Sequence, residues 1–292
     1  MEKIELLKKF REEADIYLEN AISSSNDKKK QATHINKKVT ELRKVYTNAI
    51  LISDDSSAQK LDDVLLTAYV SYIVMLEYRN KVWKYEYMSF SRRIGEMWEP
   101  FCKIPFYYPV KELAIYDPPS FKSVQITLEN EIKDYINGLE ITDNKKSELL
   151  EYYNRQSLLI GSGSISLSLD LHFTQNEIYY NVDYKSGFSS NEKGNTNRLL
   201  MVASIYKGLS AENKTLLFVR QPEADNNHYL QTLKKSNLWE VYSSDEAYNK
   251  IHEFTGFDLK NWMNVHMNWE EDISPEFKEY LIENDLIKYL TW

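Results

Sequence analysis

The chain has 292 residues, a formal net charge of −8 and one cysteine, Cys102. This length allows one large domain or two small ones, and a lone cysteine excludes both a disulfide framework and a cysteine-rich zinc site. No apolar run is long enough to span a membrane and the N-terminus is a charged amphipathic segment, so we expect no membrane contact and a cytoplasmic protein. The net charge weakly disfavours a nucleic-acid partner.

The first half of the chain is predicted to be mostly helical. Apolar residues recur at helical spacing over 2–22, 28–52, 60–98, 125–137 and 144–159. The second of these segments is basic, so it is either a solvated helix face or a surface that contacts phosphates. Five prolines between residues 99 and 123 predict irregular structure there, because proline lacks the amide hydrogen that a helix interior needs.

Residues 164 to 185 predict a β-hairpin. Polar and apolar residues alternate from Ser164 to Phe173 and again from Ile178 to Lys185, with a short polar turn between them. The apolar residues share one face only if paired residue numbers add up to an odd number, and a turn around Gln175 and Asn176 gives 351. In that register Asp170 and Asp183 are diagonal neighbours on the polar face.

The register also places Lys185 on the polar face with the two aspartates, and a slip by one residue would separate them. The apolar face from Leu167 to Phe173 is expected to pack on a helix over 196–207. Strands over 214–219 and 239–242 alternate with helices over 228–235 and 246–254. This order predicts an α/β fold with α+β character, in which helices flank a mixed central sheet.

The polar face of the hairpin suggests metal-assisted phosphodiester hydrolysis. Two carboxylates held close together repel each other, and a divalent cation such as Mg²⁺ relieves the repulsion while keeping waters for a substrate. A lysine beside them can orient an attacking water and stabilise a charged phosphate. An ordinary hairpin with a solvated polar face is the alternative, since the pattern acid-x-Lys occurs at six other places in the chain.

Asp170, the hairpin, Asp183-Tyr184-Lys185 and the helix and strand that follow resemble the core of the PD-(D/E)XK nuclease superfamily, which includes type II restriction endonucleases. The resemblance covers about residues 90 to 255, although Leu169 stands where proline usually precedes the first aspartate. It implies a restriction-endonuclease-like core in which Asp170 and Asp183 bind Mg²⁺ and Lys185 positions the water. Gly95 to Glu99 fits a Gly-x-x-x-Glu pattern, which suggests a third catalytic acid at Glu99, with Glu96, Glu148 and Glu151 as alternatives.

The resemblance further implies a type II restriction endonuclease of a restriction-modification system, which acts as a homodimer on double-stranded DNA at a specific, palindromic site. The helices over 60–98 or the two N-terminal helices could form the dimer interface, and the sequence does not choose between them. The polar loop after Lys185 is expected to contact DNA through Ser186, Ser189, Ser190, Asn191, Lys193, Asn195, Asn197 and Arg198.

Three segments are expected: an N-terminal helical region over 1–85 for DNA contact or dimerisation, a catalytic core over 86–260 with an insert over 100–160, and an acidic helical tail over 261–292. Two other functions stay open. One is a repair or mobile-element nuclease of the same superfamily without tight sequence specificity. The other is a DNA-binding or helical interaction protein without enzymatic activity.

Overall fold

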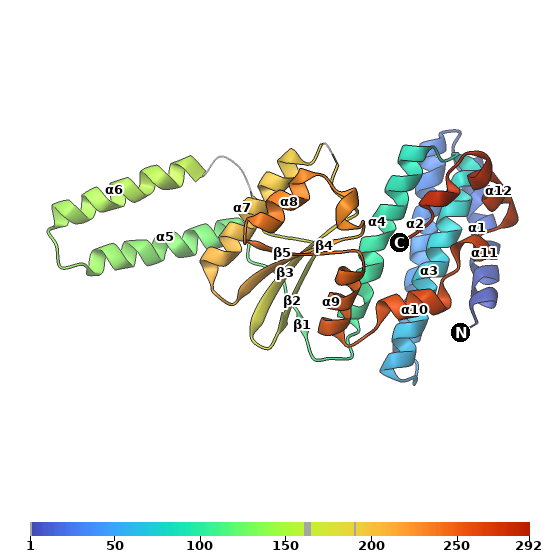
Figure 1. Ribbon diagram of the computed structural model, residues 1–292, viewed down its shortest axis with the longest axis horizontal. Helices are drawn as coiled ribbons and strands as arrows, with labels where there is room; N and C mark the ends of the chain where they lie inside the picture. Colours follow the sequence, from blue (N-terminus) through green and yellow to red (C-terminus); the bar gives the residue numbers. More distant parts are fainter. Residues whose placement is uncertain (1, 161–164, 190) are drawn as a thin grey trace.

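The computed structural model describes residues 2–160, 165–189 and 191–292, and these ranges form an α+β fold in which helices surround one five-stranded mixed sheet (Figure 1). The strands are β1 Ala114–Ile115, β2 Leu171–Gln175, β3 Ile178–Lys185, β4 Asn213–Val219 and β5 Trp239–Ser243. The helices are α1 Lys3–Ser24, α2 Lys28–Ile52, α3 Ser57–Val82, α4 Tyr87–Tyr107, α5 Phe121–Gly138, α6 Asp143–Ile160, α7 Lys193–Leu209, α8 His228–Lys235, α9 Asp245–Thr255, α10 Leu259–His266, α11 Trp269–Asp272 and α12 Pro275–Glu283, with 3₁₀ turns η1 Glu223–Asp225 and η2 Ile287–Tyr289. None of the helices within these ranges combines the length and the apolar run that crossing a membrane requires.

The strands lie in the sheet in chain order, from β1 to β5. β1, β2 and β3 form an antiparallel meander, and β4 and β5 run parallel to β3. A parallel neighbour needs a long crossover, which α7 provides between β3 and β4 and α8 between β4 and β5. The expected mixed sheet flanked by helices is confirmed.

Helices cover both faces of the sheet. On one face, Trp98 of α4 packs edge-on against Tyr184 of β3 with ring centroids 5.6 Å apart, and Phe254 of α9 packs against Phe173 of β2 at 5.0 Å. On the other face, Leu199 and Val202 of α7 lie in a separate apolar cluster with Leu217 and Val219 of β4 and with α8. The sheet is therefore a buried middle layer, and its polar groups can meet solvent only at its ends and edges.

The predicted first strand of the hairpin is wrong in extent. Ser164 lies outside the described residues, residues 165–169 are not in the sheet, and β2 begins at Leu171 after a bend at Asp170. Leu167 and Leu169 pack with α7 as expected, but Leu171 and Phe173 face α4 and α9 on the opposite side. The bend explains the difference, because it exchanges the faces on which alternate side chains lie.

The prediction of one helix over 60–98 followed by irregular structure is also wrong. The helix is interrupted after α3, where the side chain of Asn80 accepts the Tyr85 amide at 2.9 Å, and α4 then runs through Pro100 and Pro105 to Tyr107. Prolines interrupt the hydrogen bonds of a helix, but the buried face of α4 is apolar along its whole length. The buried residues are Phe90, Ile94, Gly95, Met97, Trp98, Phe101, Cys102, Pro105 and Phe106.

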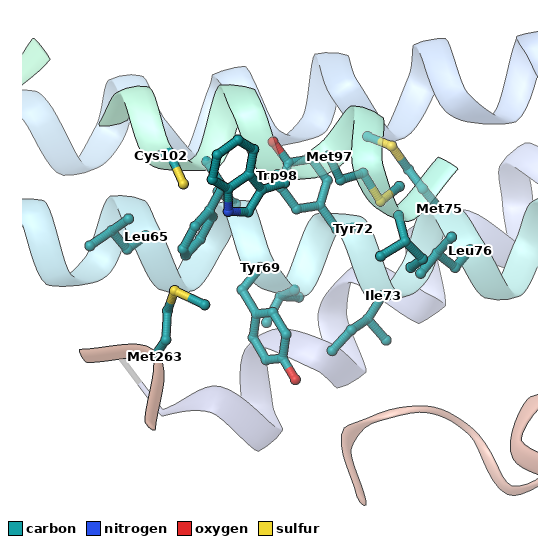
Figure 2. Packing of buried hydrophobic residues seen from close by; sticks show 14 of the residues in the cluster. Leu65, Tyr69, Tyr72, Ile73, Met75, Leu76, Met97, Trp98, Cys102 and Met263 are labelled. Atoms are coloured by element: carbon teal, nitrogen blue, oxygen red, sulfur yellow. The ribbon is translucent and has the colours of Figure 1, made fainter. Parts of the chain in front are cut away.

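α3 is the centre of the main hydrophobic core. It is buried on nearly all sides, and Figure 2 shows Tyr69 and Tyr72 of α3 close to Trp98 of α4 and Met263 of α10. Trp292, near the end of the chain, packs against Tyr72 with ring centroids 6.1 Å apart. The boundaries predicted near residues 85 and 261 both fall within this one cluster, so the N-terminal helices, the sheet and the C-terminal helices share a core.

α5 and α6 form an antiparallel arm that projects from the edge of the sheet (Figure 1). The arm is inserted between β1 and β2, within the segment 100–160 predicted as an insert. Only Val124 and Ile136 of α5 are buried.

Candidate active site

A two-residue turn fixes the register of the hairpin. Asn176 and Glu177 have φ values of 52° and 65°, the left-handed conformation that tight hairpin turns require. Paired residues such as Leu171 and Val182 add up to 353 rather than the expected 351, because the turn lies one residue further along the chain. The sum is still odd, so the apolar residues of the two strands share one face, as predicted. Extending the register by one residue beyond Leu171 would place Asp170 opposite Asp183 rather than diagonal to it.

Asp183 is the buried acid of this face. Its side chain is 2 % exposed, and Oδ2 lies 2.6 Å from the Lys185 Nζ while Oδ1 lies 3.5 Å from an Arg198 guanidinium nitrogen of α7. The side chains of Asp183 and Lys185 leave β3 on the same side because they are two residues apart in a strand. Lys185 is the ion-pair partner of Oδ2, and no other group of the described residues donates a hydrogen bond to that oxygen.

The buried Asp183 has a raised affinity for a proton. Burial raises the pKa of Asp183 to about 6; the positive charge of Lys185 opposes the rise, and the negative charge of Asp170 adds to it. The site therefore holds a carboxylate whose ionised form is only partly compensated by the surrounding cations. Such a group favours a further positive charge beside it.

Asp170 connects the two sides of the sheet. Its Oδ2 accepts the backbone N–H of Tyr184 at 2.7 Å, and its backbone carbonyl accepts a hydrogen bond from Lys103 of α4 at 3.1 Å. The same lysine donates to Glu99 at 2.7 Å. Glu99 is thus joined to the aspartates through Lys103, a residue that the sequence analysis missed although it lies one helical turn after Glu99.

The other candidate acids lie elsewhere. Glu96 pairs with Arg92, whose Nε is 2.7 Å from its Oε1. Glu148 and Glu151 lie on α6 in the projecting arm, where Glu151 pairs with Arg155 (Figure 1).

α4 makes close contact with the loop after β3. A Cβ atom on Gly95 would lie 2.6 Å from the Ser186 Oγ, so glycine permits this approach. Ser186 in turn accepts a hydrogen bond from the Arg220 Nε at 3.0 Å, and burial lowers the pKa of Arg220. Ser186, expected to contact DNA, therefore lies between α4 and Arg220 at the end of β3, a contact that no sequence motif indicated.

The remaining loop residues are arranged around the start of α7. Arg198 donates to Asn195 at 3.3 Å, and Asn195 donates to Glu192 at 3.0 Å. Ser189, Asn191, Lys193 and Asn197 are exposed, and Ser190 lies outside the described residues.

The two aspartates are ligands of the type that Mg²⁺ prefers, although no group of three or more His, Cys, Asp or Glu side chains within the described ranges is arranged to hold a metal ion. Mg²⁺ commonly takes one or two protein carboxylates and completes its coordination with waters and phosphate oxygens. The buried carboxylate of Asp183 and the nearby carboxylate of Asp170 supply the one or two carboxylates that this requires.

Comparison with known proteins gives no relative: no family model, curated protein or solved structure matches this chain. The functional argument therefore depends on the site itself.

Proposed function

We propose that this protein is a Mg²⁺-dependent endonuclease that hydrolyses double-stranded DNA at a specific site, as a type II restriction endonuclease does. The observation that carries the proposal is the buried Asp183, paired at 2.6 Å with Lys185 two residues later and close to Asp170, whose Oδ2 accepts the backbone N–H of Tyr184 at 2.7 Å. An ordinary solvated hairpin would leave such carboxylates exposed to water, whereas Asp183 is 2 % exposed.

The order of elements also supports the proposal. A helix, α4, precedes a three-stranded antiparallel meander, and a crossover helix, α7, leads to the parallel strand β4. The resemblance to the PD-(D/E)XK core predicts a first aspartate with a hairpin, then the Asp-x-Lys pattern, then a helix and a further strand. Asp170 immediately precedes β2 and Lys185 ends β3.

The side chains have distinct roles in this proposal. Asp170 and Asp183 hold Mg²⁺, which when bound stabilises the charge that develops on a phosphodiester during hydrolysis. Lys185, which is 20 % exposed, orients water and donates to the phosphate from the open side of the pair. Glu99 pairs with Lys103, which in turn donates to the backbone carbonyl of Asp170 and so helps to position that residue.

The arm supports the homodimer that cutting both strands of a palindrome requires. α5, α6 and α7 border an open apolar groove of about 750 Å³, lined by residues such as Leu128, Ile132 and Met201. α3, proposed from the sequence as one possible interface, is instead buried within the protein. We infer that two copies pair through their arms.

Plasmid cleavage with and without Mg²⁺ tests the proposal. We expect discrete fragments from the wild-type protein, and at least about 10³-fold slower cleavage for Asp183→Asn and for Lys185→Ala, because each removes an electrostatic contribution of several kcal/mol to the reaction. Glu276→Gln and Lys278→Ala form the matched control, since they belong to another acid-x-Lys sequence on α12, and they should cleave normally.

The fragment pattern separates the alternatives. A smear of products would indicate a non-specific nuclease of the repair or mobile-element type instead of a site-specific enzyme. Cleavage that persists in Asp183→Asn would show that the site is wrong, and absence of Mg²⁺-dependent cleavage by the wild-type protein would leave a non-enzymatic protein.

A further inference from the structure

A basic groove lies along the N-terminal half of α4. It has a volume of about 550 Å³ and is bordered by Arg79, Arg92 and Arg93, with Asn36 and Ser89 as further polar residues and Glu96 as its one acid. Three arginines against one glutamate give this groove local positive charge in a chain whose net charge is −8. Local positive charge of this kind attracts anions despite the charge of the whole molecule.

Arg79 is the most unusual of the three arginines. It is 9 % exposed, and its guanidinium lies over the rings of Tyr85 and Trp83, at 3.9 and 4.8 Å from their centroids. No carboxylate of the described residues lies within ion-pair distance of it, and burial lowers its pKa. The guanidinium also donates to the backbone carbonyl of Trp83, but neither this bond nor the two rings supply a full negative charge, so a bound anion would stabilise it further.

Arg93 also has unused hydrogen-bonding capacity. Its Nε is buried without a hydrogen-bond partner among the described residues, and Glu96 lies at the longer distance of 3.5 Å. Arg92 is 80 % exposed and pairs with Glu96 at 2.7 Å. A surface ion pair of this kind contributes little free energy, so Arg92 can leave Glu96 for a stronger anion.

One stripe of α4 runs from the groove to Glu99 and Lys103. Arg92, Glu96, Glu99 and Lys103 lie on one stripe of α4, at spacings of four, three and four residues. Arg92 is seven residues from Glu99, which is about 10 Å along a helix and corresponds to about three nucleotides of rise along a DNA strand. Gly95, within one turn of the arginines, contacts Ser186 beside Lys185.

We propose that this groove binds the phosphate backbone of the DNA duplex next to the scissile bond, with Arg92 and Arg93 donating to phosphate oxygens and Arg79 supplying buried positive charge. This inference rests on the proposed nuclease function and adds to it the path of the substrate over α4. Arginine suits this role because its planar donors match phosphate in two parallel hydrogen bonds.

The test is the salt dependence of binding to a labelled DNA duplex by fluorescence anisotropy, without Mg²⁺ so that no cleavage occurs. In Arg92→Gln/Arg93→Gln we expect affinity to fall about 10-fold or more, and the slope of log K against log salt to fall by about 1.8, since each phosphate contact contributes about 0.9. Arg92→Lys/Arg93→Lys should keep the slope because it keeps the charge.

Lys278→Gln is the matched control. Lys278 is also an exposed helical cation, 3.5 Å from Glu270, but it lies on α12, outside both the groove and the arm, so its loss should leave the affinity and the slope unchanged. If the double variant unfolds, Arg92→Gln alone, at an 80 % exposed position, should lower the slope by about 0.9.

Two outcomes overturn the inference. Unchanged binding by the Arg92 and Arg93 variants, or equal loss in Lys278→Gln, would exclude the groove as a specific contact while site-dependent cleavage by the wild-type protein keeps the nuclease proposal. A wild-type protein that neither binds nor cleaves DNA would overturn both.

Discussion

Asp183 shows at the scale of one residue how a functional site opposes stability. A buried position in a strand normally holds an apolar residue. Burial raises the pKa of Asp183 to about 6, although Lys185 and Arg198 lie nearby. The folded protein thus binds a proton at Asp183 more tightly than the unfolded chain does. Its stabilising effect is complete below about pH 4 and is lost as the pH rises through about 6.

Asp183→Asn should therefore stabilise the protein at neutral pH while it abolishes cleavage. We expect the free energy of unfolding of the variant to exceed that of the wild type by up to about 3 kcal/mol at pH 7, because about two pKa units separate the folded and unfolded states. The difference should vanish towards pH 4, where Asp183 is protonated. Urea denaturation between pH 4 and pH 8 measures it.

The control for this prediction is Asp54→Asn, in the exposed turn between α2 and α3, which should show no comparable trend with pH. If Asp183→Asn were less stable than the wild type across the whole range, the ion pairs with Lys185 and Arg198 would outweigh the cost of burial. The conflict described for this residue would then be absent.

At the scale of elements, the approach of α4 to the loop after β3 determines how Glu99 and Lys103 reach the aspartates. Gly95→Ala places a methyl group 2.6 Å from the Ser186 Oγ and 2.9 Å from its Cβ, so the helix or the loop must move. Overpacking of this kind costs about 1–3 kcal/mol. We expect loss of that size in unfolding experiments and about 10-fold slower cleavage, because Lys103 is displaced from Asp170.

The control for the helix contact is Gly208→Ala near the end of α7, where no atom lies within 4 Å of the new methyl group. It should keep full activity and gain a little stability, since alanine is the better helix former. Ser186→Gly should restore much of the activity of Gly95→Ala by making room. If Gly95→Ala cleaved normally, the helix contact would not position the site.

The sequence pattern predicted the positions of helices and strands better than it predicted which elements pack together. The helices over 28–52 and 228–235 are confirmed with the same bounds, and the second hairpin strand over 178–185 is confirmed as well. Residues 165–169 alternate like a strand because Leu167 and Leu169 are buried against α7, yet they form no part of the sheet. Alternating polar and apolar residues show only that every second side chain is buried. The hydrogen bonds to a neighbouring strand distinguish a strand from an extended segment that packs beside a helix.

The site residues that share one strand could be predicted from the sequence. The residues that reach the site from distant parts of the chain could not. Asp183 and Lys185 are two residues apart in a strand, so their side chains were expected on the same face. The odd sum of paired residue numbers followed from matching the apolar faces of the two strands. Lys103 and Arg220 join the site through contacts made by the packing of α4 and by the start of the segment after β4. No local spacing encodes such contacts, so the sequence alone could not indicate them.

At the scale of the whole molecule, the arm projects away from the shared core (Figure 1). Two helices of 18 residues each gain little stability by themselves in water. Yet the arm carries large apolar side chains in solvent, among them Ile126, Tyr135 and Tyr152, with exposed fractions of 47, 70 and 59 %. Exposed apolar surface of this extent is typical of an interface between proteins.

A second copy of the chain fits the arm better than a charged partner does. The two helices carry five basic and six acidic side chains, so they are nearly neutral and present both signs to a symmetric mate. Helices of 18 residues are about 27 Å long, and a face two helices wide buries roughly 1,000 Å² over both partners, near the lower limit for a stable interface. Continuation into the groove beside Met201 adds to this area.

We therefore expect a homodimer in solution that Leu128→Glu or Met201→Glu converts to a monomer, since each places a charge in the apolar groove. Sedimentation equilibrium measures the change, and Val265→Glu, at a 68 % exposed position on α10, should leave the dimer intact. The monomeric variants should still bind Mg²⁺ at the aspartates but nick one strand of a plasmid instead of cutting both, because each copy supplies one site. A wild-type monomer that makes double-strand breaks would contradict pairing through the arm and would require one site to act on each strand in turn.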